Sequence, residues 1–289
     1  MGARAALRRA GRDPGAHGPA GGALIHTGSS AAAIHGAPVY IGTAGWTLPR
    51  EQQPRFPAEG SHLQRYAAVL PAVEINTTFY RSHRAATWAR WAASVPGDFR
   101  FSAKLPRAIT HAARLVDVDA ALDAFLAEVG LLGPKLGCVL VQLPPSLQFD
   151  ADVAGAFFRA LRERHAGPVA CEPRHATWFT PGADALLADA TVARVAADPV
   201  RAPGADEPGG WPGLAYYRLH GSPRMYYSAY EPEYLGALAA RIEGLRGHGV
   251  PVWCIFDNTT LGAATANALD LLQRLNPLAE SSVFQLPAG

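Results

Sequence analysis

Apolar and β-branched residues recur in eight short runs along the chain, roughly 20 to 40 residues apart. Most runs end in polar or charged residues, and Ala/Leu-rich stretches with helical spacing separate most of them. The predicted strands are Val39–Trp46, Ala72–Tyr80, Arg100–Arg107, Cys138–Ser146, Val169–His175, Thr191–Pro199, Leu214–Gly221 and Pro251–Thr259. The predicted helices are Leu63–Leu70, Ala85–Ser94, Asp119–Leu132, Ala151–His165, Pro181–Ala190, Pro232–Gly247 and Leu261–Leu275. Eight alternating units predict a TIM (β/α)₈ barrel, with the first strand beside the eighth.

One connection departs from this pattern. Arg201–Gly213, after the sixth strand, is rich in Pro and Gly and predicts no helix of normal length. A doubly wound open sheet is the alternative fold. The chain has no GxGxxG or P-loop motif to support that alternative, so the barrel is favoured.

The first residues differ in composition from the rest. Met1–Gly36 is rich in Ala, Gly and Arg, is nearly free of acid and lacks the continuous apolar run of a secretory signal. We therefore expect residues 1–36 to be a disordered extension and residues 37–289 to form a single TIM-barrel domain. No apolar run approaches the ~20 residues of a membrane span, so we expect no membrane partner.

Charge and cysteine usage narrow the class of protein. The formal net charge of +2 argues against a dedicated nucleic-acid binder, which normally has a strong basic bias. Cys138, Cys171 and Cys254 each fall inside a strand signal, and their spacing matches no metal-ligand pattern. We expect three small buried side chains, and unpaired thiols are typical of a cytoplasmic protein.

Side-chain alternation predicts which strand residues point into the barrel. The helix-facing side of each strand must be apolar, so the polar sets should face inward. These sets are Glu74 with Asn76, Ser102 with Lys104, Glu172 with Arg174, Arg194 with Asp198, and Tyr216 with Arg218 and His220. Buried charges are costly unless paired, so some members are expected to form structural ion pairs. The rest predict a polar pocket at the C-terminal ends of the strands.

Several motifs near the strand ends resemble the DUF72, or YecE-like, family. They are IGTAGW (Ile41–Trp46), VEINTTFYR (Val73–Arg81), FSAKLPRAITH (Phe101–His111), LVQLPP (Leu140–Pro145), CEPRHATW (Cys171–Trp178), YRLHG (Tyr217–Gly221) and FDNTTLGAATAN (Phe256–Asn267). The resemblance covers nearly the whole chain after residue 36. It implies a TIM barrel and supplies no reaction, because the family has no established biochemical function. Ala44 stands where the family usually has Ser.

Four residues are candidates for catalysis. Glu74 and Glu172 are a carboxylate pair suited to acid–base work, and His220 is a further acid–base candidate. Lys104 is the only lysine in a predicted strand, and a barrel lysine with a lowered pKa can form a Schiff base. The alternative for Lys104 is an ion pair with Glu74.

The remaining candidates bind a ligand. Glycines in the loops after strands seven and eight can let backbone N–H groups approach a phosphate, with Arg218 and Arg224 adding charge. The alternative is an ordinary loop followed by a helix N-cap. Aromatic side chains at the strand ends can wall the pocket or simply pack. The full predicted set is Asn76, Tyr80, Gln142, Arg174, Trp178, Arg218, Gly221, Arg224, Tyr226, Asp257, Asn258 and Gly262.

We predict no cofactor. Glu74, Glu172, Asp198, Asp257 and His220 include the ligand types of a divalent metal, but the interleaved Arg and Lys would repel one. We favour an enzyme whose substrate is a small, polar, anionic metabolite, either phosphorylated or sugar-like. That small molecule is the expected partner. The alternative is a non-catalytic protein that binds a small molecule, nucleotide or nucleic acid. The oligomeric state stays open.

Overall fold

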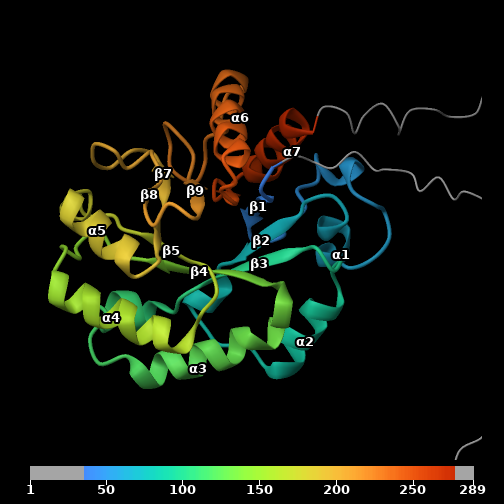
Figure 1. The fold of residues 1–289 in the computed structure, drawn as a ribbon. Helices are drawn as coiled ribbons and strands as arrows, with labels where there is room; N and C mark the ends of the chain where they lie inside the picture. Colours follow the sequence, from blue (N-terminus) through green and yellow to red (C-terminus); the bar gives the residue numbers. More distant parts are fainter. Residues whose placement is uncertain (1–35, 277–289) are drawn as a thin grey trace, which may run out of the picture. The chain divides into compact units, whose positions relative to one another are not determined.

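The structure is a computed structural model that describes residues 36–276 (Figure 1). All eight predicted strands are present, and the sixth is divided into two short strands. The strands are β1 Val39–Ala44, β2 Ala72–Ile75, β3 Arg100–Lys104, β4 Leu136–Gln142, β5 Val169–Glu172, β6 Ala193–Arg194, β7 Ala196–Asp198, β8 Gly209–Gly210, β9 Ala215–Leu219 and β10 Val252–Phe256.

The strands close into a TIM-like barrel. Their order in the sheet is β7-β9-β10-β1-β2-β3-β4-β5-β6-β8. β1 pairs in parallel with β10, so the first strand does lie beside the eighth. β6 and β7 sit near the two ends of this order, yet only Val195 separates them along the chain. The two ends therefore meet, and the predicted barrel is confirmed. β8, which pairs antiparallel with β6, is an unpredicted addition.

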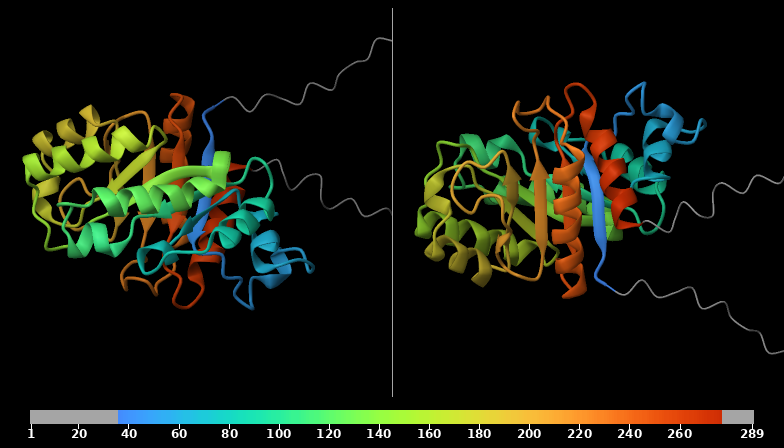
Figure 2. Two further views of the ribbon diagram at one scale, coloured as in Figure 1. Left: turned by 90° about the horizontal axis from the view of Figure 1, so that it is seen from below. Right: turned by 90° about the horizontal axis from the view of Figure 1, so that it is seen from above.

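Helices lie around the strands, as the two further views show (Figure 2). They are α1 His62–Ala67, α2 Ala85–Ala93, α3 Asp119–Val129, α4 Ala151–Arg164, α5 Pro181–Asp189, α6 Pro232–Gly247 and α7 Ala263–Leu275. Short 3₁₀ or π turns are η1 Gln53–Arg55, η2 Thr77–Phe79, η3 Ala108–Ala112, η4 Gly130–Lys135 and η5 Ala176–Trp178. Local capping explains several starts, because side chains of Ser61, Asp150 and Thr180 accept backbone N–H bonds of α1, α4 and α5. The connection between β7 and β9 contains no helix, as predicted.

The alternation of side chains separates two apolar layers. Cys138, Leu140, Tyr216, Trp253 and Ile255 belong to a buried cluster inside the barrel. The intervening residues of the same strands pack against the helices in a larger cluster. Fully burying each large apolar side chain is worth about 1.5–3 kcal/mol, so this register is strongly favoured. The three cysteines are buried and free, as predicted.

The sixth strand contradicts the predicted orientation. Ala193 and Val195 lie in the cluster inside the barrel, so Arg194 and Asp198 face outward. Arg194 donates to Asp184 of α5 at 2.7 Å, and Asp198 accepts from the Tyr230 hydroxyl at 2.8 Å. These polar side chains can face outward because the connection after the sixth strand forms no helix to cover its outer side. The backbone of that loop lies there instead, and carbonyl oxygens of the loop, such as that of Gly204, need hydrogen-bond donors.

The predicted disordered extension lies outside the described residues, apart from Gly36. The single domain predicted for residues 37–289 stays a prediction, because residues 277–289 also lie outside them. Between residues 36 and 276, no helix has the length and apolar character needed to cross a membrane.

Candidate functional site

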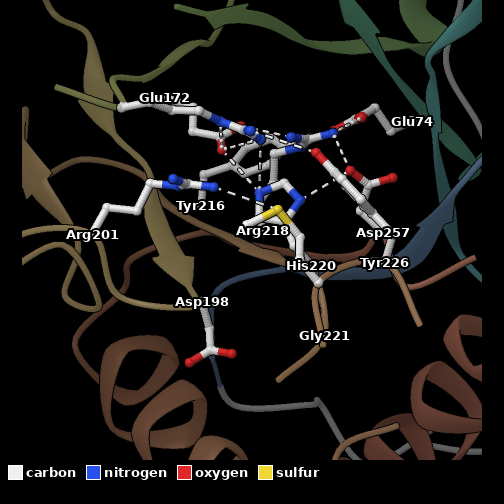
Figure 3. A network of polar contacts seen from close by, with 12 residues as sticks. Glu74, Glu172, Asp198, Arg201, Tyr216, Arg218, His220, Gly221, Tyr226 and Asp257 are labelled. Carbon is white, nitrogen blue, oxygen red and sulfur yellow. Dashed lines mark hydrogen bonds and ion pairs between the residues drawn. The ribbon is translucent and has the colours of Figure 1, made fainter. Parts of the chain in front are cut away.

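A buried ionic network occupies the C-terminal ends of β2, β5, β9 and β10 (Figure 3). At its centre Arg218 is 0% exposed. Its guanidinium holds Glu74 through two bonds, from Nη2 to Oε1 at 2.7 Å and from Nε to Oε2 at 2.9 Å. It also donates to Glu172 at 2.6 Å and to Asp257 at 3.2 Å. Burial lowers the pKa of Arg218, but the three carboxylates outweigh it and raise that pKa well above its usual value.

His220 joins two of these carboxylates. Its Nδ1 lies 3.0 Å from Asp257 Oδ2, and its Nε2 lies 2.9 Å from Glu172 Oε1. Burial raises the pKa of both acids. Arg174, Arg218 and the hydrogen-bonded His220 more than offset this effect for Glu172, and Arg218 and His220 do so for Asp257. The pKa of Glu172 is therefore well below its usual range and that of Asp257 is also lowered, so both carboxylates are ionised at neutral pH.

Tyr216 lies beneath the network. Its hydroxyl is 3.1 Å from Glu74 Oε2 and 2.9 Å from Ser102 Oγ, and its ring stacks on Trp253. Burial and the Glu74 charge raise the pKa of Tyr216 well above 10, so the phenol is a neutral donor. Tyr216 and Trp253 therefore cover the side of the network that faces the barrel interior.

Arg174 and Tyr226 lie at the outer edge of the network. Arg174 Nη2 is 3.0 Å from Glu172 Oε1, and its Nη1 is 3.5 Å from the Tyr226 hydroxyl. Tyr226 packs edge-on against His220 and has a φ of 69°, which is rare for a residue with a side chain. Backbone strain of this kind costs roughly 1–3 kcal/mol and concentrates at functional sites.

Lys104 ends β3 beside this network without joining it. Among the described residues, no carboxylate oxygen lies within 4.0 Å of its Nζ, which lies 4.2 Å from the centroid of the Phe79 ring. The predicted Lys104–Glu74 ion pair is therefore wrong, and both oxygens of Glu74 bind Arg218 instead. Burial, reinforced by Arg218, lowers the pKa of Lys104 to about 8, against the opposing pull of the carboxylates.

His111 and Arg107 were not predicted as site residues. His111 lies in the π-helical turn η3, and its ring packs edge-on against Phe79 at 4.9 Å. Burial lowers its pKa first, and the charges of Lys104, Arg107 and Arg174 lower it further. These three cations therefore lie near one imidazole. The sequence signal was the clustering of Lys104, Arg107 and His111 within eight residues at the end of β3, and π turns are common at functional sites.

The predicted anion site after strands seven and eight does not match the geometry. The Gly221 N–H donates to the Tyr230 hydroxyl at 2.8 Å, and the Gly262 N–H donates to the Thr259 carbonyl at 3.1 Å. Arg224 is exposed and stacks on Tyr227. Arg218 is wholly enclosed by carboxylates. Neither glycine N–H is thus left for a phosphate.

Some of the other predicted ligand residues lie at the C-terminal edge of the barrel near the ionic network, and others do not. Gln142 is buried and pairs in register with Glu172, which places it on the same edge. Asn76 follows β2, and its buried Oδ1 has no hydrogen-bond partner among the residues described. Asn258 faces away, with its Nδ2 bonded to Ser228 and Asn267.

Two predicted aromatic residues take no part in the ionic network. Trp178 is buried, packs against Phe149 and donates to the Leu147 carbonyl, so packing explains it. Tyr80 is 76% exposed and contacts Phe79 edge-on.

A metal does not fit this arrangement well. Glu74, Glu172 and Asp257 each accept a hydrogen bond from Arg218, so at least one oxygen of each is already engaged. Residues 36–276 contain no group of three or more His, Cys, Asp or Glu arranged to hold a metal ion.

The fold and the network define the class of protein as a TIM-like barrel with a charged cluster at the C-terminal ends of its strands. Residues 40–288 match the family described as "Protein of unknown function DUF72", and the chain belongs to that family. The resemblance carried by the strand-end motifs is confirmed.

Named relatives agree with this assignment. The chain is 35% identical over 106 residues to UPF0759 protein YecE of Escherichia coli K12, covering 37% of this chain and 38% of that protein. It is 29% identical over 151 residues to UPF0759 protein YunF of Bacillus subtilis 168, covering 50% and 53%. The matched region spans about two fifths to one half of each relative.

Solved structures show the same fold. A DUF72 family protein from Thermotoga maritima MSB8 is 25% identical with a TM-score of 0.69, covering 83% of this chain and 99% of that one. A DUF72 family protein from Enterococcus faecalis V583 is 22% identical with a TM-score of 0.69, covering 84% and 99%.

Proposed function

We propose that the chain is an enzyme that acts by acid–base chemistry on a small polar metabolite carrying an anionic group. One observation carries the proposal. The Lys104 ammonium and the His111 ring both contact the Phe79 ring, at 4.2 and 4.9 Å from its centroid. The pKa of Lys104 is lowered to about 8, and burial also lowers the pKa of His111 from its usual value. At neutral pH the lysine is mostly an acid and the histidine mostly a base. Groups whose pKa values lie on either side of the working pH are suited to proton transfer.

The distribution of charge favours an anionic substrate. Glu74 and Glu172 lie deepest in the network and are already bonded to arginine. The side chains of Lys104 and Arg174 lie nearer the edge, and Arg107 adds a third cation near His111. A ligand at this edge can meet Lys104, Arg174 and Arg107, although the Asp257 carboxylate is exposed to a similar extent. Arginines bind phosphate or carboxylate through charge-assisted hydrogen bonds.

These contacts give the predicted catalytic residues different roles. Glu74 and Glu172 hold Arg218 and Arg174 in place, which makes them positioning residues. His220 bridges Glu172 and Asp257 and orients both carboxylates. Lys104 and His111 are the groups left to meet a substrate. We also infer a cytoplasmic location, supported by the three free thiols.

A thermal-shift screen with matched ligand pairs tests the proposal. Ribose 5-phosphate with ribose, and glyceraldehyde 3-phosphate with glyceraldehyde, differ only in the phosphate. We expect the melting temperature to rise with a phosphorylated member, and Arg107→Gln or Arg174→Gln to weaken that binding about tenfold or more. Arg224→Gln is the matched control, because Arg224 is exposed and stacks on Tyr227, and it should leave binding unchanged.

Two outcomes would contradict this proposal. One is no phosphate-dependent shift with any pair. The other is a shift that Arg224→Gln removes and Arg107→Gln keeps, which would place the anion in the loop after β9.

A further inference from the structure

Lysine is rare in this chain. Two lysines stand among the 26 basic residues, so the other 24 are arginines. Lys135 donates its Nζ to the carbonyl oxygens of Ala92 and Val95 at 2.5 and 2.6 Å. Within residues 36–276, the ammonium of Lys104 has neither a hydrogen bond nor an ion pair, and it lies 4.2 Å from the centroid of the Phe79 ring. An amine that no hydrogen bond or ion pair holds can lose its proton and react as a nucleophile. A guanidinium at this position would stay charged and could not do so.

The surroundings of Lys104 favour its neutral form. The side chain is 7% exposed, and burial disfavours the ammonium. Arg218 adds repulsion, while Glu74, Glu172 and Asp257 oppose it. With a pKa of about 8, roughly a tenth of the amine is unprotonated at pH 7, against about one part in a few thousand for an ordinary lysine. The neutral amine is the nucleophilic form.

We propose that Lys104 forms an imine with a small aldehyde or ketone that carries an anionic group, an inference that rests on the proposed function. The amine nitrogen forms a bond to the carbonyl carbon, and the carbonyl oxygen takes up a proton to give a carbinolamine. That hydroxyl then leaves as water. Overall, the ammonium and the carbonyl compound give a protonated imine and one water, with no net change in protons.

Neighbouring groups suit these steps. His111 carries a lowered pKa, so its neutral ring can take the proton from the ammonium and return it to the departing hydroxyl. Arg107 and Arg174, which also act on His111, can hold the anionic group of the carbonyl compound. The protonated imine then withdraws electrons from the neighbouring carbon, the activation needed for aldol-type cleavage or isomerisation.

Reductive trapping tests the imine directly. The full chain is incubated with cyanoborohydride and glyceraldehyde 3-phosphate, with formaldehyde as the smallest carbonyl probe, and digested for peptide mass spectrometry. We expect the Lys104 peptide to gain the adduct at least tenfold faster than the Lys135 peptide with both probes. Lys135 is the internal control because its ammonium is held by two carbonyls. Glyceraldehyde should label Lys104 more slowly than its phosphate.

The variant Lys104→Arg separates this inference from the proposed function. It keeps a cation but cannot form an imine, so it should retain the phosphate-dependent thermal shift and lose the adduct at position 104. A phosphate-dependent shift without preferential trapping at Lys104 would overturn the imine and leave acid–base chemistry standing. Preferential trapping without any phosphate-dependent shift would support the amine and overturn the anionic substrate. Labelling of Lys104 no faster than Lys135 with both probes refutes the inference.

Discussion

Replacing Arg218 by Met should unfold this barrel more readily than almost any other single change at the site. Met retains much of the buried stem, but it removes the cation that holds Glu74, Glu172 and Asp257. Both Glu74 oxygens would lose their charged partner. Removing one partner of a buried ion pair costs about 3–5 kcal/mol. For a chain of this size, that corresponds to a loss of roughly 6–20 °C in melting temperature.

The dependence of this loss on pH follows from the carboxylates. In the native protein the pKa values of Glu172 and Asp257 are lowered, so their stabilisation is complete above their unfolded pKa values. It is lost as the pH falls through the folded values. In Arg218→Met the same acids are buried with fewer cations, so their pKa values rise and protonation relieves the strain. The difference between the two proteins should therefore shrink as the pH falls from 7 towards 5.

Urea denaturation at pH 8, 7, 6 and 5 measures both effects. Arg224→Met is the control and should change the free energy of unfolding by less than about 0.5 kcal/mol, because Arg224 is exposed. In the double variant Glu74→Gln with Arg218→Met, at least about 1 kcal/mol of the loss should return. If Arg218→Met costs less than about 1 kcal/mol at pH 7, or its deficit grows as the pH falls, the electrostatic reasoning is refuted.

Three further changes test single contacts. Lys104→Met should stabilise the protein by up to about 3 kcal/mol at pH 7, because a pKa lowered from 10.5 to about 8 penalises the charged folded form. That gain is complete below pH 8 and should fade between pH 8 and 10.5; a gain that is independent of pH in urea denaturation would contradict it. Gly221→Ala should cost about 1–3 kcal/mol, because φ is 92° and the new Cβ would lie 2.8 Å from the Ser228 carbonyl; Gly97→Ala, with no atom within 4 Å, is the control. Arg194→Met should lower the melting temperature and leave ligand binding unchanged, since Arg194 bonds Asp184 outside the barrel.

Local pattern was enough for most of the fold. Short runs of apolar and β-branched residues identified all eight strands, and apolar spacing near 3.6 identified the seven helices within a few residues. Side-chain alternation also placed Glu74, Lys104, Glu172 and Arg218 on inward-facing positions. These features depend on which face of each element must be apolar, and a single strand or helix carries that information in its own residues.

The sixth strand shows that the residues of a strand do not always reveal which of its faces points into the barrel. Its apolar residues Val195 and Ala197 were assigned to the outside because the helix-facing side of each strand was expected to be apolar. Loop backbone and α5 cover this one, so Arg194 and Asp198 find polar partners outside the barrel. What covers a strand depends on segments far along the chain, and the pattern of that strand does not contain it.

The chemistry of the site depends even more on three-dimensional competition. Glu74 and Arg218 are 144 residues apart in sequence, and barrel closure brings them within 2.7 Å. Arg218 binds both Glu74 oxygens, and burial together with the charge of Arg218 lowers the pKa of the unpaired Lys104. Residue types and side-chain alternation predict which charged side chains point into a barrel. Which charges neutralise each other, and which one is left to react, follows from distances and from the few acceptor oxygens they share.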